Sequence, residues 1–171
     1  MNKIIETNRL LFREFTEEDA PLLYNLNLDP EVIRYTLDPI SDVAHAAKIL
    51  REVILPQYKH YGHGRWAVFL KDQNEFIGWC GLKYLDELNE VDLGYRYMKK
   101  YWAKGYATEA AKASLDYGFN VVNLERIVGR ALPGNIASIK VLEKCGMSYI
   151  GQQVVQGLLH ETYELVKSNL R

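Results

Sequence analysis

The spacing of apolar residues changes along this chain, and each change marks a boundary between predicted elements. Residues 9–15 (RLLFREF) alternate, with Leu10 and Phe12 on one face, which is typical of a strand. Residues 107–119 instead repeat small and apolar side chains at intervals of three and four, which indicates one face of an amphipathic helix. Because both kinds of pattern recur along the chain, the sequence predicts an α/β fold.

The predicted order is a strand, helices, three strands, a helix, a strand, a helix and two strands. The early helices are expected to begin after Thr16, at Asp29-Pro30-Glu31 and at Ser41, and Pro56 is expected to end the third. The later elements are strands at 66–71, 75–85, 90–98, 126–132, 147–155 and 158–166 and helices at 107–119 and 136–144. This order implies a mixed, mostly antiparallel sheet with helices on both sides, in one domain spanning residues 1–171.

Composition narrows the classes of function. A chain of 171 residues that is 48% hydrophobic can bury one full core, and its net charge of −1 gives no strong field for nucleic acid or an anionic membrane. No signal peptide is recognisable, and no apolar run approaches the ~20 residues that span a bilayer. Cys80 and Cys145 lack metal-ligand spacing. We therefore expect a cytoplasmic enzyme without a metal, in monomeric or homodimeric form.

The turn between the strand 90–98 and the helix 107–119 is the first candidate binding site. It contains Gly105, where the backbone can bend freely, and a strand that enters a helix in this way leaves N–H groups pointing at one spot. The helix dipole adds positive charge there, which suits a phosphate or pyrophosphate. A P-loop is excluded because Tyr106 stands where lysine is needed, and a dinucleotide fingerprint because the turn has one glycine. An ordinary turn with a helix cap remains the alternative.

The motif Trp102-x-x-Gly105-x-Ala107 resembles the acetyl-CoA signature Q/R-x-x-G-x-G/A of the GCN5-related N-acetyltransferase (GNAT) superfamily. The longer run 101–110 (YWAKGYATEA) is most similar to the RimJ/RimL-type branch. A second motif, Asn135-x-x-Ser138-x-x-Val141-Leu142-x-Lys144-x-Gly146-Met147, resembles the family's N-x-x-A/S-x-x-L/V-Y-x-K-x-G-F. The order of elements matches that fold across nearly the whole chain. The resemblance implies an acetyl-CoA-dependent N-acetyltransferase whose central strands splay apart.

The resemblance also implies which residues bind the cofactor. Backbone groups of the splayed strand would hold pantetheine and the acetyl carbonyl, and the turn would hold the pyrophosphate. Trp102 replaces the family's Gln or Arg, but the contact there is largely through the backbone. Asn135 would bond the pantetheine arm, or only cap its helix, or both. The expected set is Tyr95, Arg96, Tyr97, Trp102, Ala103, Lys104, Gly105, Tyr106, Ala107, Thr108, Asn135, Ser138 and Lys144.

The catalytic candidates follow from a departure in the second motif. Leu142 stands where many relatives carry the tyrosine that protonates the leaving thiolate, and an aliphatic side chain cannot donate a proton. RimL-type members resemble this chain in carrying serine at the position of Ser138, which is therefore the candidate donor; the alternative is a small residue merely tolerated beside the cofactor. For the general base the candidates are Asp92 and Glu161, with His160 beside them. An Asp–Arg surface pair would explain Asp92 equally well.

The acceptor is the least defined part of the prediction. The resemblance implies direct transfer to a primary amine, with the early helices and the closing strands forming the acceptor's side of the site. A protein or peptide N-terminal α-amine is the first choice, because the run 101–110 is closest to that branch. A small-molecule amine (polyamine, antibiotic or amino acid) and a non-catalytic acetyl-CoA sensor are the alternatives. A polyamine is disfavoured because no acidic cluster is evident.

Overall fold

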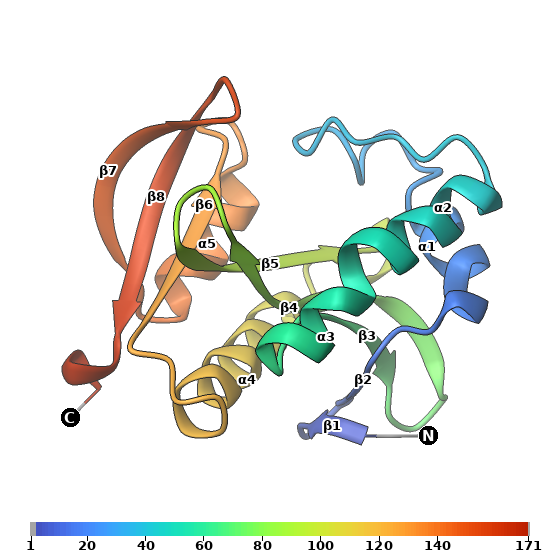
Figure 1. Cartoon of the computed structure of the whole chain (residues 1–171), viewed down its shortest axis with the longest axis horizontal. Helices are drawn as coiled ribbons and strands as arrows, with labels where there is room; N and C mark the ends of the chain where they lie inside the picture. Colours follow the sequence, from blue (N-terminus) through green and yellow to red (C-terminus); the bar gives the residue numbers. More distant parts are fainter. Residues whose placement is uncertain (1–2, 171) are drawn as a thin grey trace.

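The protein is built around one eight-stranded sheet, described here for residues 3–170 of a computed structural model (Figure 1). Its strands are β1 Lys3–Glu6, β2 Leu10–Arg13, β3 Arg65–Leu70, β4 Glu75–Leu85, β5 Glu90–Tyr97, β6 Arg126–Ala131, β7 Ser148–Val155 and β8 Leu158–Val166. They lie in the order β1-β2-β3-β4-β5-β6-β8-β7. Only the β5–β6 pair is parallel among the described residues. The mixed, mostly antiparallel sheet expected from the sequence is confirmed.

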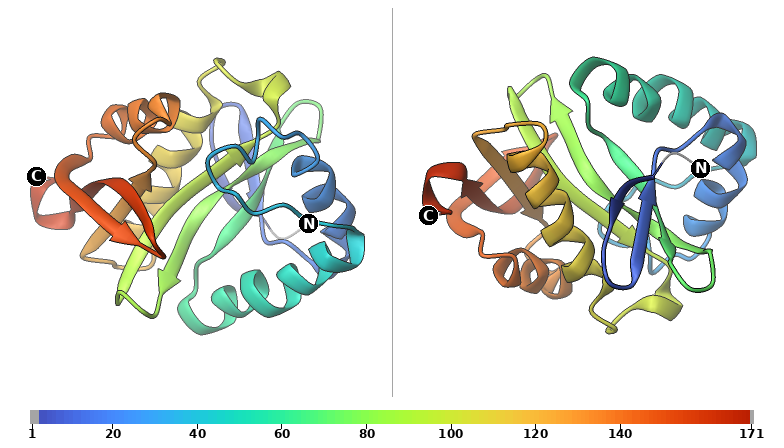
Figure 2. Two further views of the ribbon diagram at one scale, coloured as in Figure 1. Left: turned by 90° about the horizontal axis from the view of Figure 1, so that it is seen from above. Right: turned by 90° about the horizontal axis from the view of Figure 1, so that it is seen from below.

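Helices cover both faces of this sheet (Figure 2). They are α1 Ala20–Leu26, α2 Val43–Ile49, α3 Leu55–Tyr61, α4 Tyr106–Asn120 and α5 Ile136–Lys144. Alternation along β3 separates two cores: Trp66 and Val68 pack with the residues of α4, whereas Ala67 and Phe69 pack with those of α1 and α2. The small face predicted for α4 is buried, with Ala110 and Ala111 both fully enclosed. Close approach of α4 to the sheet follows from those small side chains.

The sheet opens between its two central strands. β5 and β6 pair at only two positions, Asp92 with Val128 and Leu93 with Gly129. β5 nevertheless continues to Tyr97 alongside β4. Among the strands of residues 3–170, residues 94–97 therefore have a neighbour on one side only, which is the splay that the family resemblance implies. A parallel pair that ends early leaves backbone hydrogen-bonding groups available to a ligand.

The N-terminal third contains the errors of the sequence prediction. No helix forms at Asp29-Pro30-Glu31: the Asp29 carboxylate accepts the N–H of Glu31 at 2.9 Å, as a helix cap would, but the segment continues as a series of turns. Pro56 does not end the third helix either. A π-helical stretch, Leu50–Ile54, joins α2 to α3, and Pro56 lies in the first turn of α3, where its missing N–H is not needed.

The sheet also begins earlier than the sequence indicated. β1 was not predicted, since its four residues show no alternation of apolar and polar side chains. The opening strand expected at 9–15 is shorter, Leu10–Arg13, and pairs with β1 on one side and β3 on the other. Pairing with β2 is therefore what makes residues 3–6 a strand.

Candidate active site

The turn that precedes α4 has the geometry of an anion site. Ala103 and Gly105 both have positive φ angles, 58° and 81°, and residues 102–105 are exposed. Gly105 is the N-cap of the fifteen-residue helix α4 and supplies no side-chain cap. The first N–H groups of α4 therefore lie at an exposed helix end, with the positive end of the helix dipole behind them. This arrangement fits the pyrophosphate predicted for 103–108.

A cluster that the sequence did not reveal fixes this turn in place. Glu109 in the first turn of α4 accepts hydrogen bonds from the Thr7 hydroxyl at 2.6 Å, the Arg9 N–H at 3.0 Å and Arg9 Nε at 2.6 Å. Arg9 Nη1 also donates to the Lys104 carbonyl at 2.9 Å, and its guanidinium lies 4.4 Å from the ring centroid of Tyr106. Burial opposes ionisation of Glu109, but the bonds from Thr7 and Arg9 prevail and lower its pKa. No local pattern links residues a hundred positions apart.

Tyr95 and Ser138 meet where the sheet opens. The Tyr95 hydroxyl lies 2.8 Å from the Ser138 carbonyl oxygen, to which it can donate, and 3.0 Å from Ser138 Oγ. Burial raises the pKa of the Tyr95 phenol. Asn135 caps α5 by accepting the Ser138 N–H at 3.2 Å through Oδ1, so its amide nitrogen is not used by the cap. β5 and α5 thus bring three of the predicted site residues together.

The other two residues that the second motif singles out lie apart from this pair. Leu142 is 1% exposed and packs against β6, where a Cβ added to Gly129 would lie 2.5 Å from Leu142 Cδ2. It is a core residue. Lys144 is exposed in the last turn of α5, and its role towards the cofactor stays a prediction.

The side chains of Arg96, Tyr97 and Trp102 have structural partners. The Arg96 guanidinium turns to the opposite face of β5, where it bonds Asn27 Oδ1 at 2.8 Å and both oxygens of Asp38. The Tyr97 side chain is buried, and its carbonyl accepts the indole N–H of Trp102 at 2.8 Å. The side chains of Arg96 and Tyr97 are thus engaged within the protein, and the backbone contact with pantetheine that the resemblance implies stays a prediction.

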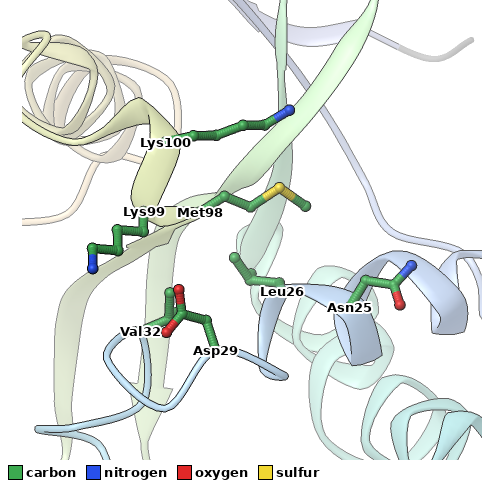
Figure 3. Close-up of a pocket in the computed structure, with 7 residues that line it drawn as sticks. All are labelled: Asn25, Leu26, Asp29, Val32, Met98, Lys99 and Lys100. Atoms are coloured by element: carbon green, nitrogen blue, oxygen red, sulfur yellow. The ribbon is translucent and has the colours of Figure 1, made fainter.

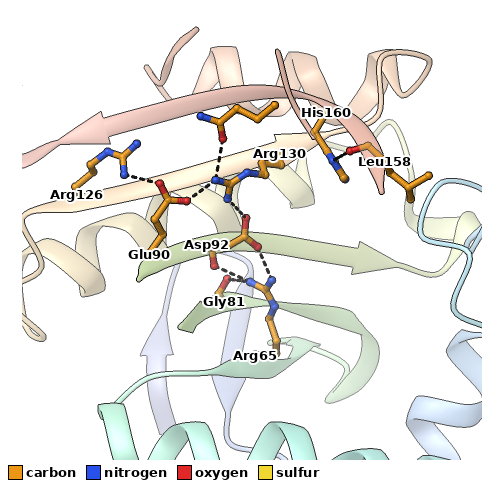
Figure 4. Close-up of polar contacts among 9 residues, drawn as sticks. Arg65, Gly81, Glu90, Asp92, Arg126, Arg130, Leu158 and His160 are labelled. Carbon is orange, nitrogen blue, oxygen red and sulfur yellow. Dashed lines mark hydrogen bonds and ion pairs between the residues drawn. The ribbon is translucent and has the colours of Figure 1, made fainter. Parts of the chain in front are cut away.

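Asp92 lies in a network of ions on that opposite face (Figure 4). Its Oδ2 accepts from Arg65 Nη2 at 2.8 Å, and its Oδ1 lies 3.8 Å from Arg130 Nη1. Arg65 also donates to the carbonyls of Gly81 and Asp92, at 2.6 and 2.9 Å, while Arg130 bonds Glu90. The Asp–Arg pair considered from the sequence therefore exists, but its arginine is Arg65. Both carboxylate oxygens face guanidinium groups, so Asp92 is poorly placed to collect a proton.

Glu161 and His160 point to different faces of β8. Glu161 lies on the α5 side, where it accepts from Gln152 Nε2 at 2.9 Å and from the Tyr149 hydroxyl at 2.7 Å, and these bonds lower its pKa. His160 lies on the other side, with Nδ1 2.9 Å from the Leu158 carbonyl (Figure 4). Asp92 and Glu161 are thus on opposite sides of the sheet. Neither role as a base is decided, and both stay predictions.

A groove of about 580 Å³ lies between the end of α1 and the end of β5 (Figure 3). Its lining residues are Asn25, Leu26, Asp29, Val32, Met98, Lys99 and Lys100. Lys99 is paired with Glu31 and Lys100 with Glu75, so their charges are already compensated. Within residues 3–170, no three His, Cys, Asp or Glu side chains are grouped to hold a metal, and no helix could cross a membrane.

The comparisons with known proteins agree with this geometry. The family described as "Acetyltransferase (GNAT) domain" matches residues 9–148, so the chain belongs to the GNAT acetyltransferases, enzymes whose fold uses acetyl-CoA. An uncharacterized N-acetyltransferase, p20, of Bacillus licheniformis is 33% identical over 96% of this chain and 89% of its own length. A GNAT-family acetyltransferase from Bacillus anthracis superposes with a TM-score of 0.80 at 27% identity, covering 96% of this chain and 98% of that one.

A more distant structure supports the fold alone. RimL, a ribosomal-protein α-N-acetyltransferase in complex with coenzyme A, superposes with a TM-score of 0.81 over 96% of this chain and 98% of its own, at 17% identity. The GNAT fold and the N-acetyltransferase class expected from the sequence are confirmed. The acceptor is a separate question.

Proposed function

We propose that this enzyme transfers the acetyl group of acetyl-CoA directly to the α-amine of a protein or peptide N-terminus. The observation that carries this proposal is the stretch 94–97 of β5, which pairs with β4 but not with β6. At one end it leads into the uncapped start of α4, and from its middle the Tyr95 side chain reaches Ser138 on α5. The phosphate site beyond one end of this edge and the hydroxyl pair beside its middle fit the two ends of an acyl-pantetheine arm.

The residues present fit acetyl-CoA. The N–H groups of 103–108 would hold the pyrophosphate, the free backbone groups of 94–97 the pantetheine arm, and the unused amide nitrogen of Asn135 one of its carbonyls. The bound thioester supplies an activated acetyl group. β5 would polarise its carbonyl, and Ser138 would donate a hydrogen bond to the leaving sulfur.

The choice of acceptor rests on the weakness of the base candidates. A peptide α-amine has a pKa of about 8 and a lysine side chain one of about 10.4. At neutral pH roughly a tenth of the α-amine is already uncharged, against less than about a thousandth of the lysine amine. Asp92 is tied to Arg65, and Glu161 accepts two hydrogen bonds on the α5 side. An acceptor that needs little deprotonation suits a site of this kind.

We propose that the acceptor binds on the other side of β5, away from α4 and α5, and the charge there disfavours a polyamine. Arg65, Arg96 and Arg130 all have side chains that are largely buried on that side, each paired with a carboxylate. A ligand with several positive charges would meet three guanidinium groups whose partners are already taken. The small-molecule acceptor that remains compatible is one with a single amine, such as an amino acid.

The test is thiol release from acetyl-CoA against a matched panel of amines. The panel contains a peptide with a free N-terminus and no lysine, the same peptide with a blocked N-terminus and one lysine, free amino acids, and spermidine. We expect the highest kcat/KM for the free N-terminus. If spermidine or the lysine peptide has a kcat/KM that is higher by about tenfold or more, the enzyme acts on a small molecule or on a lysine side chain instead. Acetyl-CoA binding without thiol release from any amine would indicate a sensor.

A further inference from the structure

The Tyr95 hydroxyl is a polar group for which the family resemblance gives no role. That resemblance assigns residue 95 to the cofactor through its backbone only. In the structure the half-buried Tyr95 side chain crosses from β5 to α5 and ends 3.0 Å from Ser138 Oγ. It thereby connects the free edge of β5 with the residue proposed to face the leaving sulfur.

The proton count of the pair decides what it can do. A tyrosine hydroxyl has one proton and accepts hydrogen bonds as well, and a serine hydroxyl does the same. When Tyr95 donates to the Ser138 carbonyl, its oxygen attracts the Ser138 proton. When Tyr95 donates to Ser138 Oγ instead, the Ser138 proton is free to point at a third atom. The distances of 2.8 and 3.0 Å allow both states by a small rotation of the hydroxyl.

We propose that Tyr95 is a positioning residue for the leaving group: its hydroxyl donates to Ser138 Oγ, so that the Ser138 hydroxyl points at the sulfur. This rests on the proposed function. In the transfer step the amine nitrogen bonds to the acetyl carbon, the carbon–sulfur bond breaks, and its electron pair stays on sulfur. Ser138 donates a hydrogen bond to that thiolate and keeps its proton. The proton lost by the amine goes to water, and the thiolate regains one from water.

Relative acidity explains why the pair stabilises the thiolate without protonating it. A thiol has a pKa of about 8.5 and a phenol one of about 10, so moving the phenol's proton to the thiolate would be uphill. Burial raises the pKa of Tyr95 and widens that gap. Two linked hydroxyls strengthen one another as donors, because each bond polarises the next. Leu142, buried against Gly129, cannot contribute.

The decisive variant is Tyr95→Phe, which keeps the ring that packs between β5 and α5. We expect kcat to fall by about tenfold, while the KM and Kd for acetyl-CoA change by less than about twofold. The loss should be constant from pH 7 to 9, because no proton leaves Tyr95. In the Ser138→Ala background the same change should cost less than about twofold, since the two act as one unit. Tyr84→Phe is the matched control, because its hydroxyl bonds Asn89 Oδ1 at 2.6 Å, far along β4.

A second readout does not depend on turnover. Free coenzyme A bound to the wild-type protein should ionise at lower pH than when bound to Tyr95→Phe, as followed by the ultraviolet absorbance of the thiolate. Equal ionisation in the two complexes, full kcat in Tyr95→Phe, or losses that multiply in the double variant would each overturn the inference. If the wild-type protein releases no thiol with any amine, the proposed function fails and this inference fails with it. If the wild type turns over and Tyr95→Phe matches it, only the inference fails.

Discussion

The two sides of β5 are built in different ways. On the side of α4 and α5, the proposed cofactor site consists of free backbone groups, an uncapped helix end and the neutral hydroxyls of Tyr95 and Ser138. On the other side, Asp92 and Arg96 are both paired with ions from other elements. We propose that the first side binds acetyl-CoA, whereas the charges of the second side also hold the layers of the protein together. Substitutions on the first side should therefore alter mainly cofactor binding and catalysis, and those on the second side mainly stability.

Gly105→Val should produce the largest effect. A small effect would contradict the proposal that the side of α4 and α5 binds the cofactor. A β-branched residue is strained at φ 81°, and its Cβ would lie 3.4 Å from Arg9 Nη2, where the backbone must approach the phosphates. We expect the affinity for acetyl-CoA to fall by about a hundredfold or more, measured by calorimetry. Gly62→Val is the matched control, because Gly62 has φ 69° with open space around it. A folded Gly105→Val protein with wild-type affinity would remove the turn from the binding site.

Ser138→Ala should have the next largest effect. It removes one hydrogen-bond donor but leaves the cap of α5 intact, because Asn135 accepts the backbone N–H of residue 138. We expect kcat to fall by roughly 10- to 100-fold, with little change in the KM for acetyl-CoA. The measurement is steady-state thiol release under conditions where chemistry limits the rate. An enzyme with full kcat there would show that this serine is only a tolerated small residue.

Asp92→Asn and Glu161→Gln each remove the charge of one carboxylate. Asp92 lies on the side of the sheet with the ion pairs, and Glu161 lies on the side of α5. Both variants should keep measurable turnover, because an α-amine acceptor is already partly uncharged at neutral pH and needs little help from a base. Asp92→Asn should lower the free energy of unfolding by about 1–3 kcal/mol, because it weakens the partner of a guanidinium that is 14% exposed. Glu161→Gln should leave the free energy of unfolding nearly unchanged. Urea unfolding and thiol release measure the two properties, and loss of turnover in either variant would identify it as the base.

The pH dependence of stability should show the smallest effect. Burial lowers the pKa of His63, which lies between α3 and β3 with Nδ1 3.3 Å from the Leu82 carbonyl. Below about pH 6.5 the unfolded chain therefore binds a proton that the native protein does not, and the free energy of unfolding falls as pH drops. One such group contributes at most about 1.4 kcal/mol per pH unit.

Urea unfolding at pH 7.5 and 5.5 measures this difference. Carboxylates whose pKa values are lowered, such as Glu90 and Glu109, remain ionised at both pH values. His63→Phe should remove most of the pH dependence in this window, whereas His45→Gln, at an exposed position, should not. Equal pH dependence in wild type and His63→Phe would refute the assignment.

Local sequence patterns predicted most of the elements that are proposed to bind the cofactor. The strand β5, the glycine turn and the small face of α4 are encoded within thirty residues, and α5 was predicted with its observed bounds and its Asn135 cap. Such features depend on hydrogen bonds and periodicities that span a few residues, so the sequence expresses them directly. The Asp29-Pro30-Glu31 segment and Pro56 misled the prediction for the same reason. Both are capping or breaking signals that also fit a turn or the first residues of a continuing helix.

Local sequence patterns predicted the class of protein, most of the order of its elements, and the turn and cap proposed to hold acetyl-CoA. Which side chains contact one another became clear only in the folded protein. Tyr95 with Ser138, Arg65 with Asp92, and Arg9 with Glu109 join residues that are 43, 27 and 100 positions apart. Their contacts depend on strand register and on how closely helices approach the sheet. Those quantities arise from the packing of the whole core, and no short stretch of sequence contains them.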